Sequence, residues 1–178
     1  MSETNSLKIM VTGAGKEIPL PLLNEDIQYE NRRNLKMKKV VKFGGSSLAS
    51  AEQFRKVGEI IHAEKERRYV VPSAPGKRYS GDTKVTDMLY DCYNSASANG
   101  DISGKIKAIQ ARYQEIIDGL GLELSLDEQF AEIKEKFEEG VGSDYAASRG
   151  EFLNGIVMAA YLGYEFVDAA EVIRFDED

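Results

Sequence analysis

The order of strand, glycine turn, helix and second strand that begins at residue 40 constrains the fold of this chain most. Val40, Val41 and Phe43 have the length and β-branching of a buried strand. Two glycines end it, and helical spacing then predicts a helix over about 51–67, before another apolar run at 69–71. This alternation favours an α/β fold in which helices cover a parallel sheet.

The rest of the chain continues with helical periodicities and short apolar runs. Gly140 and Gly163 stand where two of the helices should end. Phe166-Val167 and Val172-Ile173 are predicted as short strands. Apolar residues recur at helical spacing over 85–96, 102–117, 126–137 and 152–161.

Residues 1–36 differ in pattern from the rest of the chain. Lys8-Ile-Met-Val is a candidate short strand, but the other residues before Met37 lack sustained periodicity. Gly13-Ala-Gly15 is too short for a dinucleotide-binding fingerprint. We therefore interpret 1–36 as an extension of uncertain origin with no assigned function, and 37–178 as the N-terminal portion of a domain.

Composition excludes several classes of function. A formal net charge of −7 argues against broad nucleic-acid binding. No apolar run approaches the roughly 20 residues of a membrane span. The single cysteine, Cys92, rules out an internal disulfide, fits a reducing cytoplasm, and lies on an apolar helix face where we expect it to be buried. A small molecule or a protein is the expected partner.

The segment after the first strand is the first candidate site. Gly44 and Gly45 permit close backbone approach, so that successive N–H groups, with Ser46 beside them, can face a phosphate. Lys42 would add a positive charge beside a transferring phosphoryl group. The alternative interpretation is a tight turn with an exposed lysine, since the short motif alone is weak.

Two further segments carry hydroxyl and carboxylate groups. Ser73 follows the second strand and Thr86 opens the next helix, where both could bind a carboxylate; alternatively, Asp82 or Thr83 merely caps that helix. Glu151, on a later helix, could hold an amino group or act only as a first-turn acid. The turn at 44–47 and the loop at 72–86 each follow a predicted strand. Because parallel strands end at the same edge of a sheet, we expect both segments to open onto that edge.

In this order, the motifs KFGGSS, VVPSAPG with KVTD, SRGE and LGYEFVDAAEVI resemble the N-terminal part of aspartate kinases, over about 37–178. These enzymes belong to the amino-acid-kinase group, so the resemblance implies a parallel-sheet α/β/α sandwich, here incomplete. It implies that Lys42 contacts ATP phosphates, that Gly44, Gly45 and Ser46 form the phosphate loop, that Ser73 and Thr86 line the aspartate site, and that Glu151 receives the substrate amino group.

The activity implied by this resemblance is ATP-dependent phosphorylation of L-aspartate to 4-phospho-L-aspartate. It uses Mg²⁺, precedes lysine, threonine and methionine synthesis, and takes place in the cytoplasm. No residue of the chain is assigned as a metal ligand. Whether the protein forms a homo-oligomer is not decided by the sequence. Members continue into a second half with a GRGGSD-type segment that does not occur before Asp178, so we expect the chain alone to be inactive or nearly so. Gly142-Ser143-Asp144 is not assigned to nucleotide binding.

Two alternatives remain at this stage. The chain is then either a non-catalytic fragment that serves only in binding or association, or a kinase for another amino acid or for carbamate. An incomplete sheet would expose an edge and apolar surface, which favour association. The SRGE and VTD segments favour aspartate.

Overall fold

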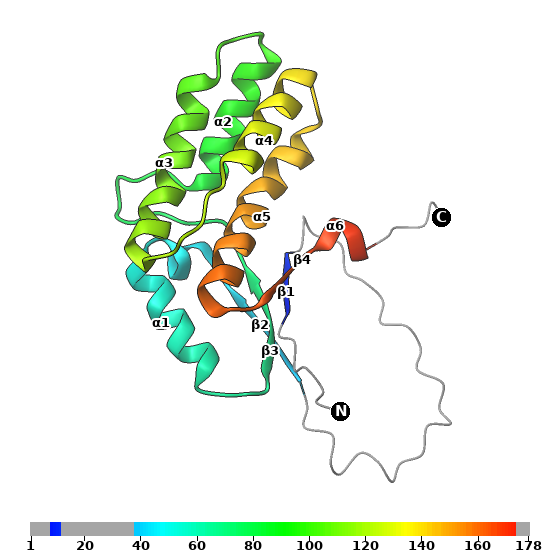
Figure 1. Ribbon diagram of the computed structural model, residues 1–178. Coiled ribbons are helices and arrows are strands. Elements are labelled where there is room, and N and C mark those ends of the chain that lie inside the picture. The colour runs from blue at the N-terminus through cyan, green and yellow to red at the C-terminus, as the bar shows by residue number, and fades with distance from the viewer. Residues whose placement is uncertain (1–7, 12–37, 174–178) are drawn as a thin grey trace, which may run out of the picture.

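A computed structural model describes residues 8–11 and 38–173, and the fold consists of a parallel sheet with helices packed along it (Figure 1). Figure 1 shows α2, α3 and α4 standing together away from the sheet, while α5 runs down to it. The elements are β1 Lys8–Val11, β2 Lys39–Phe43, the 3-10 turn η2 Gly45–Leu48, α1 Ala51–His62, β3 Arg67–Pro72, α2 Val85–Ser97, α3 Ser103–Leu120, α4 Asp127–Glu139, α5 Ser143–Leu162, β4 Glu165–Asp168 and α6 Ala169–Val172.

The sheet has the order β2-β3-β1-β4, and every pairing is parallel. In the register of β2 with β3, Lys42 pairs with Val71 and Phe43 with Pro72. The two strands therefore end side by side. The α/β fold with a parallel sheet that the sequence predicts is confirmed.

β2 differs from its prediction as a buried strand. It lies at one edge of the sheet, and Val40 is 68% exposed. β3, its neighbour, instead carries Val70 and Val71 into the core. An apolar run has the same appearance at an edge as in the interior, because pairing partners far along the chain decide its burial.

β1 occupies an interior position of the sheet, although it comes from the segment before residue 37. Lys8 pairs with Tyr69 of β3 on one side and with Glu165 of β4 on the other. The short strand predicted at Lys8–Val11 is confirmed. Within the described residues, β4 pairs with β1 and with no other strand, so β1 joins β4 to the sheet.

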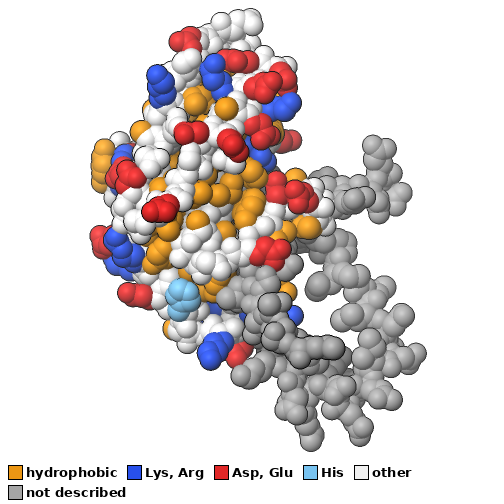
Figure 2. All heavy atoms as spheres, viewed as in Figure 1, with side chains coloured by type: hydrophobic (Ala, Val, Ile, Leu, Met, Phe, Trp, Pro, Cys, Tyr) orange, Lys and Arg blue, Asp and Glu red, His pale blue; other side chains and the backbone are white. Residues whose placement is uncertain are grey.

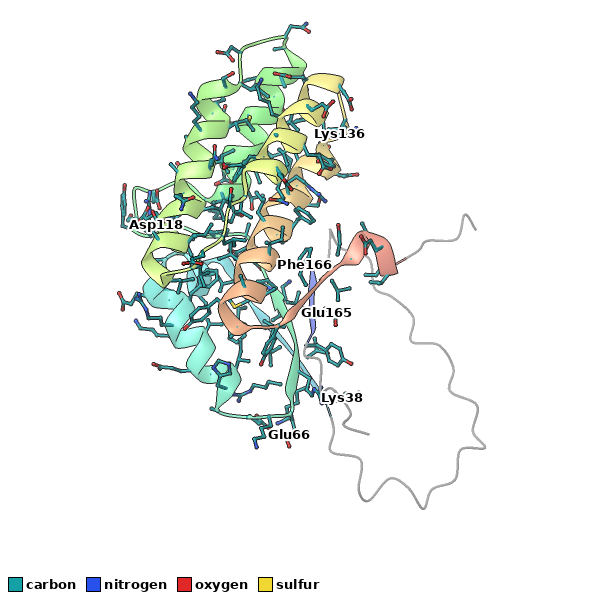
Figure 3. The ribbon with its side chains drawn as sticks, viewed as in Figure 1. Lys38, Glu66, Asp118, Lys136, Glu165 and Phe166 are labelled. Atoms are coloured by element: carbon teal, nitrogen blue, oxygen red, sulfur yellow. The ribbon has the colours of Figure 1, made fainter. Side chains whose placement is uncertain are left out.

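The hydrophobic core lies between the helices and the sheet. α5 is the helix that packs on β1, β3 and β4. In Figure 3, Phe166 lies on β4 close to α5. Its ring packs edge to face on that of Phe152, with 5.5 Å between the two ring centroids. Cys92 is fully buried as predicted, and burial raises the pKa of its thiol to about 11.

The helix ends agree only in part with the sequence prediction. Gly140 and Gly163 end α4 and α5 in the left-handed conformation, as predicted. α1 ends at His62, about five residues before the expected end. The strand predicted at Val172-Ile173 is wrong, because Asp168 accepts a hydrogen bond from the Ala170 N–H and starts the short helix α6.

None of the helices in residues 38–173 combines the length and the apolar character that crossing a membrane requires.

We expect replacement of Ile9 by proline to loosen β4. Proline removes a backbone donor from an interior strand, and the unpaired partner should lower the free energy of unfolding by about 1–3 kcal/mol. Ile9→Val keeps the donor and serves as the matched control. The measurement is thermal unfolding together with hydrogen exchange of the Phe166 and Val167 amides. Equal protection of these amides in both variants would show that β1 does not hold β4 in the sheet.

Candidate functional site

The loops after β2 and β3 begin side by side. The Ser73 N–H donates to the Phe43 carbonyl at 2.9 Å, which extends the strand pairing by one step into the loops. Lys42, at the carboxyl end of β2, is exposed at this edge. The structure therefore brings the two loops onto one edge of the sheet, as the alternation of strands predicts.

Two glycine turns touch each other directly. The Gly76 N–H donates to the Gly45 carbonyl at 2.8 Å. A Cβ on Gly45 would lie 2.7 Å from the Ala74 carbonyl oxygen, and one on Gly76 would lie 2.6 Å from the Gly45 carbonyl carbon. Neither position has room for a side chain. A Cβ on Gly44, in contrast, would meet no atom within 4 Å, so this part of the turn faces open space.

Ser46 comes after these glycines in the 3-10 turn η2 and is exposed. α1 begins only at Ala51, where the Ser50 hydroxyl accepts a hydrogen bond from the Gln53 N–H. The start of the helix predicted at about residue 51 is therefore confirmed, with the 3-10 turn η2 lying between the glycines and α1. The local backbone of η2, rather than the dipole of α1, lies beside the exposed turn.

Glu151 lies across from Lys42, in the third turn of α5. Its Oε1 accepts a hydrogen bond from the Ala74 N–H at 3.4 Å. Burial raises the pKa of the Glu151 carboxyl above its ordinary value, and the Ala74 N–H and the positive charge of Lys42 act against that rise. The carboxyl is thus half-buried, close to the loop after β3, and within the field of Lys42.

Gly150, which precedes this acid, lets α5 approach the loop. A Cβ there would lie 2.6 Å from the Ala74 Cβ and 3.3 Å from the Leu89 Cδ1. The fully buried Tyr113 of α3 donates its hydroxyl to the Gly150 carbonyl at 2.7 Å, and burial raises the pKa of that hydroxyl well above its ordinary value. The sequence alone indicated no site role for Gly150 or Tyr113.

Asn154 holds the loop from one turn further along α5. Its side chain is fully buried, and Nδ2 donates to the Ser73 carbonyl at 2.6 Å. Its Oδ1 has no hydrogen-bond partner among the described residues. Glu151 and Asn154 are three residues apart and so share a helix face. That spacing is the sequence signal by which Asn154 could have been found.

Thr86 lies in the first turn of α2 and is half-buried. The neighbouring Val85 N–H donates to the Pro75 carbonyl at 3.1 Å, which brings the start of α2 to the loop after β3. The alternative in which Asp82 or Thr83 caps α2 is wrong, since the residue before the helix is Lys84 and no side chain caps it. Asp82 binds Arg78 instead, and this contact holds the pKa of Asp82 well below its usual range.

The segment Gly142-Ser143-Asp144 stands at the start of α5. Gly142 precedes α5 and Ser143 begins it, so this segment leads into the helix as its sequence position predicts.

In the part of the chain that the structure describes, no three His, Cys, Asp or Glu side chains gather in a way that could hold a metal ion.

The parallel sheet with helices packed along it defines an α/β domain, and the comparison with known families agrees with that class. The sequence model of the amino acid kinase family matches residues 37–178. The chain belongs to the amino acid kinase family.

Its similarity to individual proteins is with aspartokinases. Aspartokinase 3 of Bacillus subtilis is 41% identical over 140 residues, which cover 75% of this chain and 31% of that protein. The crystal structure of Clostridium acetobutylicum aspartate kinase superposes with a TM-score of 0.70 at 46% identity, over 73% of this chain and 30% of that one. The chain thus spans about a third of the length of these relatives.

A more distant solved structure shares the fold. Aspartokinase III of E. coli in complex with aspartate and ADP superposes with a TM-score of 0.52 at 21% identity, over 70% of this chain and 28% of that chain. This likeness supports the architecture of the sheet and its helices.

Two glycine-to-alanine variants should change stability in opposite directions. Gly150→Ala places a methyl group against Ala74 and should lower the free energy of unfolding by about 1–3 kcal/mol. Gly104→Ala, also in a helix but facing open space, should raise it by about 0.5–1 kcal/mol. Denaturant unfolding of both variants measures the difference. A stable Gly150→Ala protein would show that α5 does not depend on this close contact.

Proposed function

We propose that this domain serves ATP-dependent phosphorylation of the side-chain carboxylate of L-aspartate, which gives 4-phospho-L-aspartate. The observation that carries the proposal is the meeting of two chemically different loops at one sheet edge. One offers Lys42 and an open glycine turn, and the other offers Ser73 beside the half-buried Glu151. The similarity to aspartokinases at 41–46% identity over part of the chain supports it.

Lys42 and the glycine turn are proposed to receive the phosphates. A lysine at the end of a strand can stabilise the negative charge that a phosphoryl group carries as it is transferred. Gly44 leaves space beside the backbone, so N–H groups there can approach phosphate oxygens closely. Ser46, exposed in the same turn, adds a hydroxyl donor.

The amino acid is proposed to lie across from this turn. Glu151 would hold its ammonium group through a charge-assisted hydrogen bond, and the hydroxyls of Ser73 and Thr86 would face its carboxylates. Burial makes the Glu151 carboxylate costly to ionise, and the charge of Lys42 offsets that cost only in part, as the raised pKa of Glu151 indicates. An ammonium group from the ligand would offset that cost, which favours an amino acid over a plain dicarboxylate.

Magnesium is expected as part of the nucleotide substrate. Since residues 38–173 hold no metal-ligand cluster, the phosphate oxygens rather than a protein cage in this region would bind the ion. The proposed setting is the cytoplasm, at the first step toward lysine, threonine and methionine. Because the chain spans about 30% of its relatives, we expect turnover by this chain alone to be weak or absent.

Separate loss of the two ligands tests the assignment. Calorimetric titration with ADP and with L-aspartate should show that Lys42→Ala weakens ADP binding about tenfold or more and spares aspartate. Glu151→Gln should weaken aspartate binding to a similar degree and spare ADP. Lys38→Ala is the matched control, because Lys38 precedes β2 and lies at the far end of that strand (Figure 3).

Turnover is measured by ADP release with aspartate present and by trapping the acyl phosphate with hydroxylamine. Robust turnover by the isolated chain would overturn the expectation of weak activity. Tighter binding of glutamate or carbamate than of aspartate would support a kinase for that other substrate. Equal effects of the Lys42 and Lys38 variants on ADP binding would remove the proposed phosphate site.

A second candidate function is association with another chain, and the open edge of β2 favours it. Among the described residues no strand pairs with the outer side of β2, where Val40 is exposed. Figure 2 shows hydrophobic side chains gathered in the middle of one face of the molecule, with charged groups around them. Phe152, Ile156 and Tyr161, all on α5, are only partly buried. Such surface favours association.

A charge on the β2 edge should reduce association. Val40→Lys places a cation on the exposed edge, which opposes strand pairing between chains. We expect a lower solution mass by light scattering and weaker binding of a hydrophobic dye than for the unchanged chain. Lys38→Ala serves as the control because it alters charge just before the strand without adding one at Val40. A monomeric unchanged chain would count against this second function.

A further inference from the structure

Arg112, on α3, is a buried cation beneath the two loops of the candidate site. The residue is only 4% exposed. Its Nη2 donates to the Ala49 carbonyl at 2.7 Å and to the Gly76 carbonyl at 3.1 Å. Ala49 directly follows η2, and Gly76 belongs to the loop after β3. One guanidinium nitrogen thus joins the segment 44–49, here termed the phosphate turn, to the segment 73–84, here termed the amino-acid loop.

The nearby acids do not explain why an arginine is buried here. Asp82 lies 3.6 Å from Arg112 Nη2, and Glu115 lies 3.8 Å from Nη1, both beyond hydrogen-bond distance. Arg78 holds both acids more closely, with Nε 2.7 Å from Asp82 and Nη1 2.6 Å from Glu115. Two arginines therefore share two acids, and the more exposed one has the better contacts.

Arg112 is also incompletely satisfied. Its Nε and Nη1 are buried and have no hydrogen-bond partner within the described part of the chain. Burial, and then the positive charge of Arg78, lower the pKa of Arg112 below its ordinary value. A well-packed apolar side chain of similar length often replaces such a buried cation with no loss of stability. The role of Arg112 should therefore lie in what its two good contacts hold.

Those contacts act on the place where the two glycine turns meet. The Gly76 N–H donates to the Gly45 carbonyl, while the Gly76 carbonyl accepts from Arg112. Both sides of the Gly76 backbone are thus fixed, one by the phosphate turn and the other by α3. Since Arg112 also binds the far end of the phosphate turn at Ala49, it closes a ring of contacts around the junction.

We propose that Arg112 is a positioning residue that fixes the phosphate turn and the amino-acid loop relative to each other, so that both ligand sites depend on it. This inference rests on the proposed function for the identity of the ligands. Its structural core, the junction of Gly45 with Gly76, does not. Lys42 and Glu151 should each affect one ligand, whereas Arg112 should affect two.

The test uses Arg112→Met, which keeps the length of the side chain and removes its donors. We expect a folded protein in which the Gly76 amide exchanges with solvent about tenfold faster or more, because its hydrogen bond is no longer held in place. Amides in distant helices, such as that of Phe130 in α4, should keep their protection. ADP and L-aspartate should each bind about tenfold more weakly, as expected when a charged donor is lost from a buried carbonyl.

The matched control is Arg55→Met. Arg55 also donates from Nη2 to a backbone carbonyl, that of Gly119, but it is exposed and joins α1 to α3 away from the loops. This variant should leave both the Gly76 exchange and the two affinities unchanged. Arg112→Lys keeps the positive charge with fewer donors, so its Gly76 exchange should lie between those of the unchanged protein and Arg112→Met. It also supplies the test if the methionine variant does not fold.

The outcomes separate this inference from the proposed function. If neither ligand binds the unchanged protein but Gly76 exchange still rises locally in the Arg112 variants, the proposed function fails and the positioning role stands. Unchanged Gly76 exchange in a folded Arg112 variant overturns the positioning role, whatever the ligands do. Equal acceleration at Gly76 and Phe130 also overturns it, since that result shows a general contribution to stability.

Discussion

The direct backbone contact between Gly45 and Gly76 is the constraint on which the rest of the site depends. The parallel register of β2 and β3 brings the two turns together, and the absence of a Cβ at either glycine lets them touch. α5 packs through Gly150 against Ala74, two residues before Gly76, and α3 binds the Gly76 carbonyl through Arg112.

How much of this arrangement the sequence predicts depends on the range of the contacts involved. Lys42 and the glycines after β2 are found by local signals, since a strand that ends in small residues predicts an open turn. Gly150, Asn154 and Arg112 depend on partners 36 to 81 residues away. The spacing from Glu151 marks the helix face of Asn154, but no local signal identifies the distant partner of any of the three. The same limit explains β2, whose edge position results from a pairing order that includes the distant β1.

The predicted cap at Asp82 fails for a different reason, which is competition between two local interactions. Asp82 stands near the start of α2, where an acid often accepts from the first free N–H groups. Arg78, four residues earlier, offers a bidentate contact and a backbone N–H as well. A bidentate pair between two charged groups is stronger than a single hydrogen bond from a neutral backbone N–H to the same carboxylate. The residue that the capping pattern selects is therefore used to shape the loop instead.

The two halves of the candidate site are preorganised to different degrees. The amino-acid side is held by buried groups, since Asn154 binds the Ser73 carbonyl and Tyr113 binds the Gly150 carbonyl. The phosphate side presents two exposed side chains, Lys42 at the end of β2 and Ser46 in the four-residue 3-10 turn η2. Long exposed side chains lose conformational entropy when a ligand fixes them, whereas buried and bonded groups have already lost it. For equal contacts, residues 38–173 should therefore bind an amino acid at a smaller entropic cost than nucleotide phosphates.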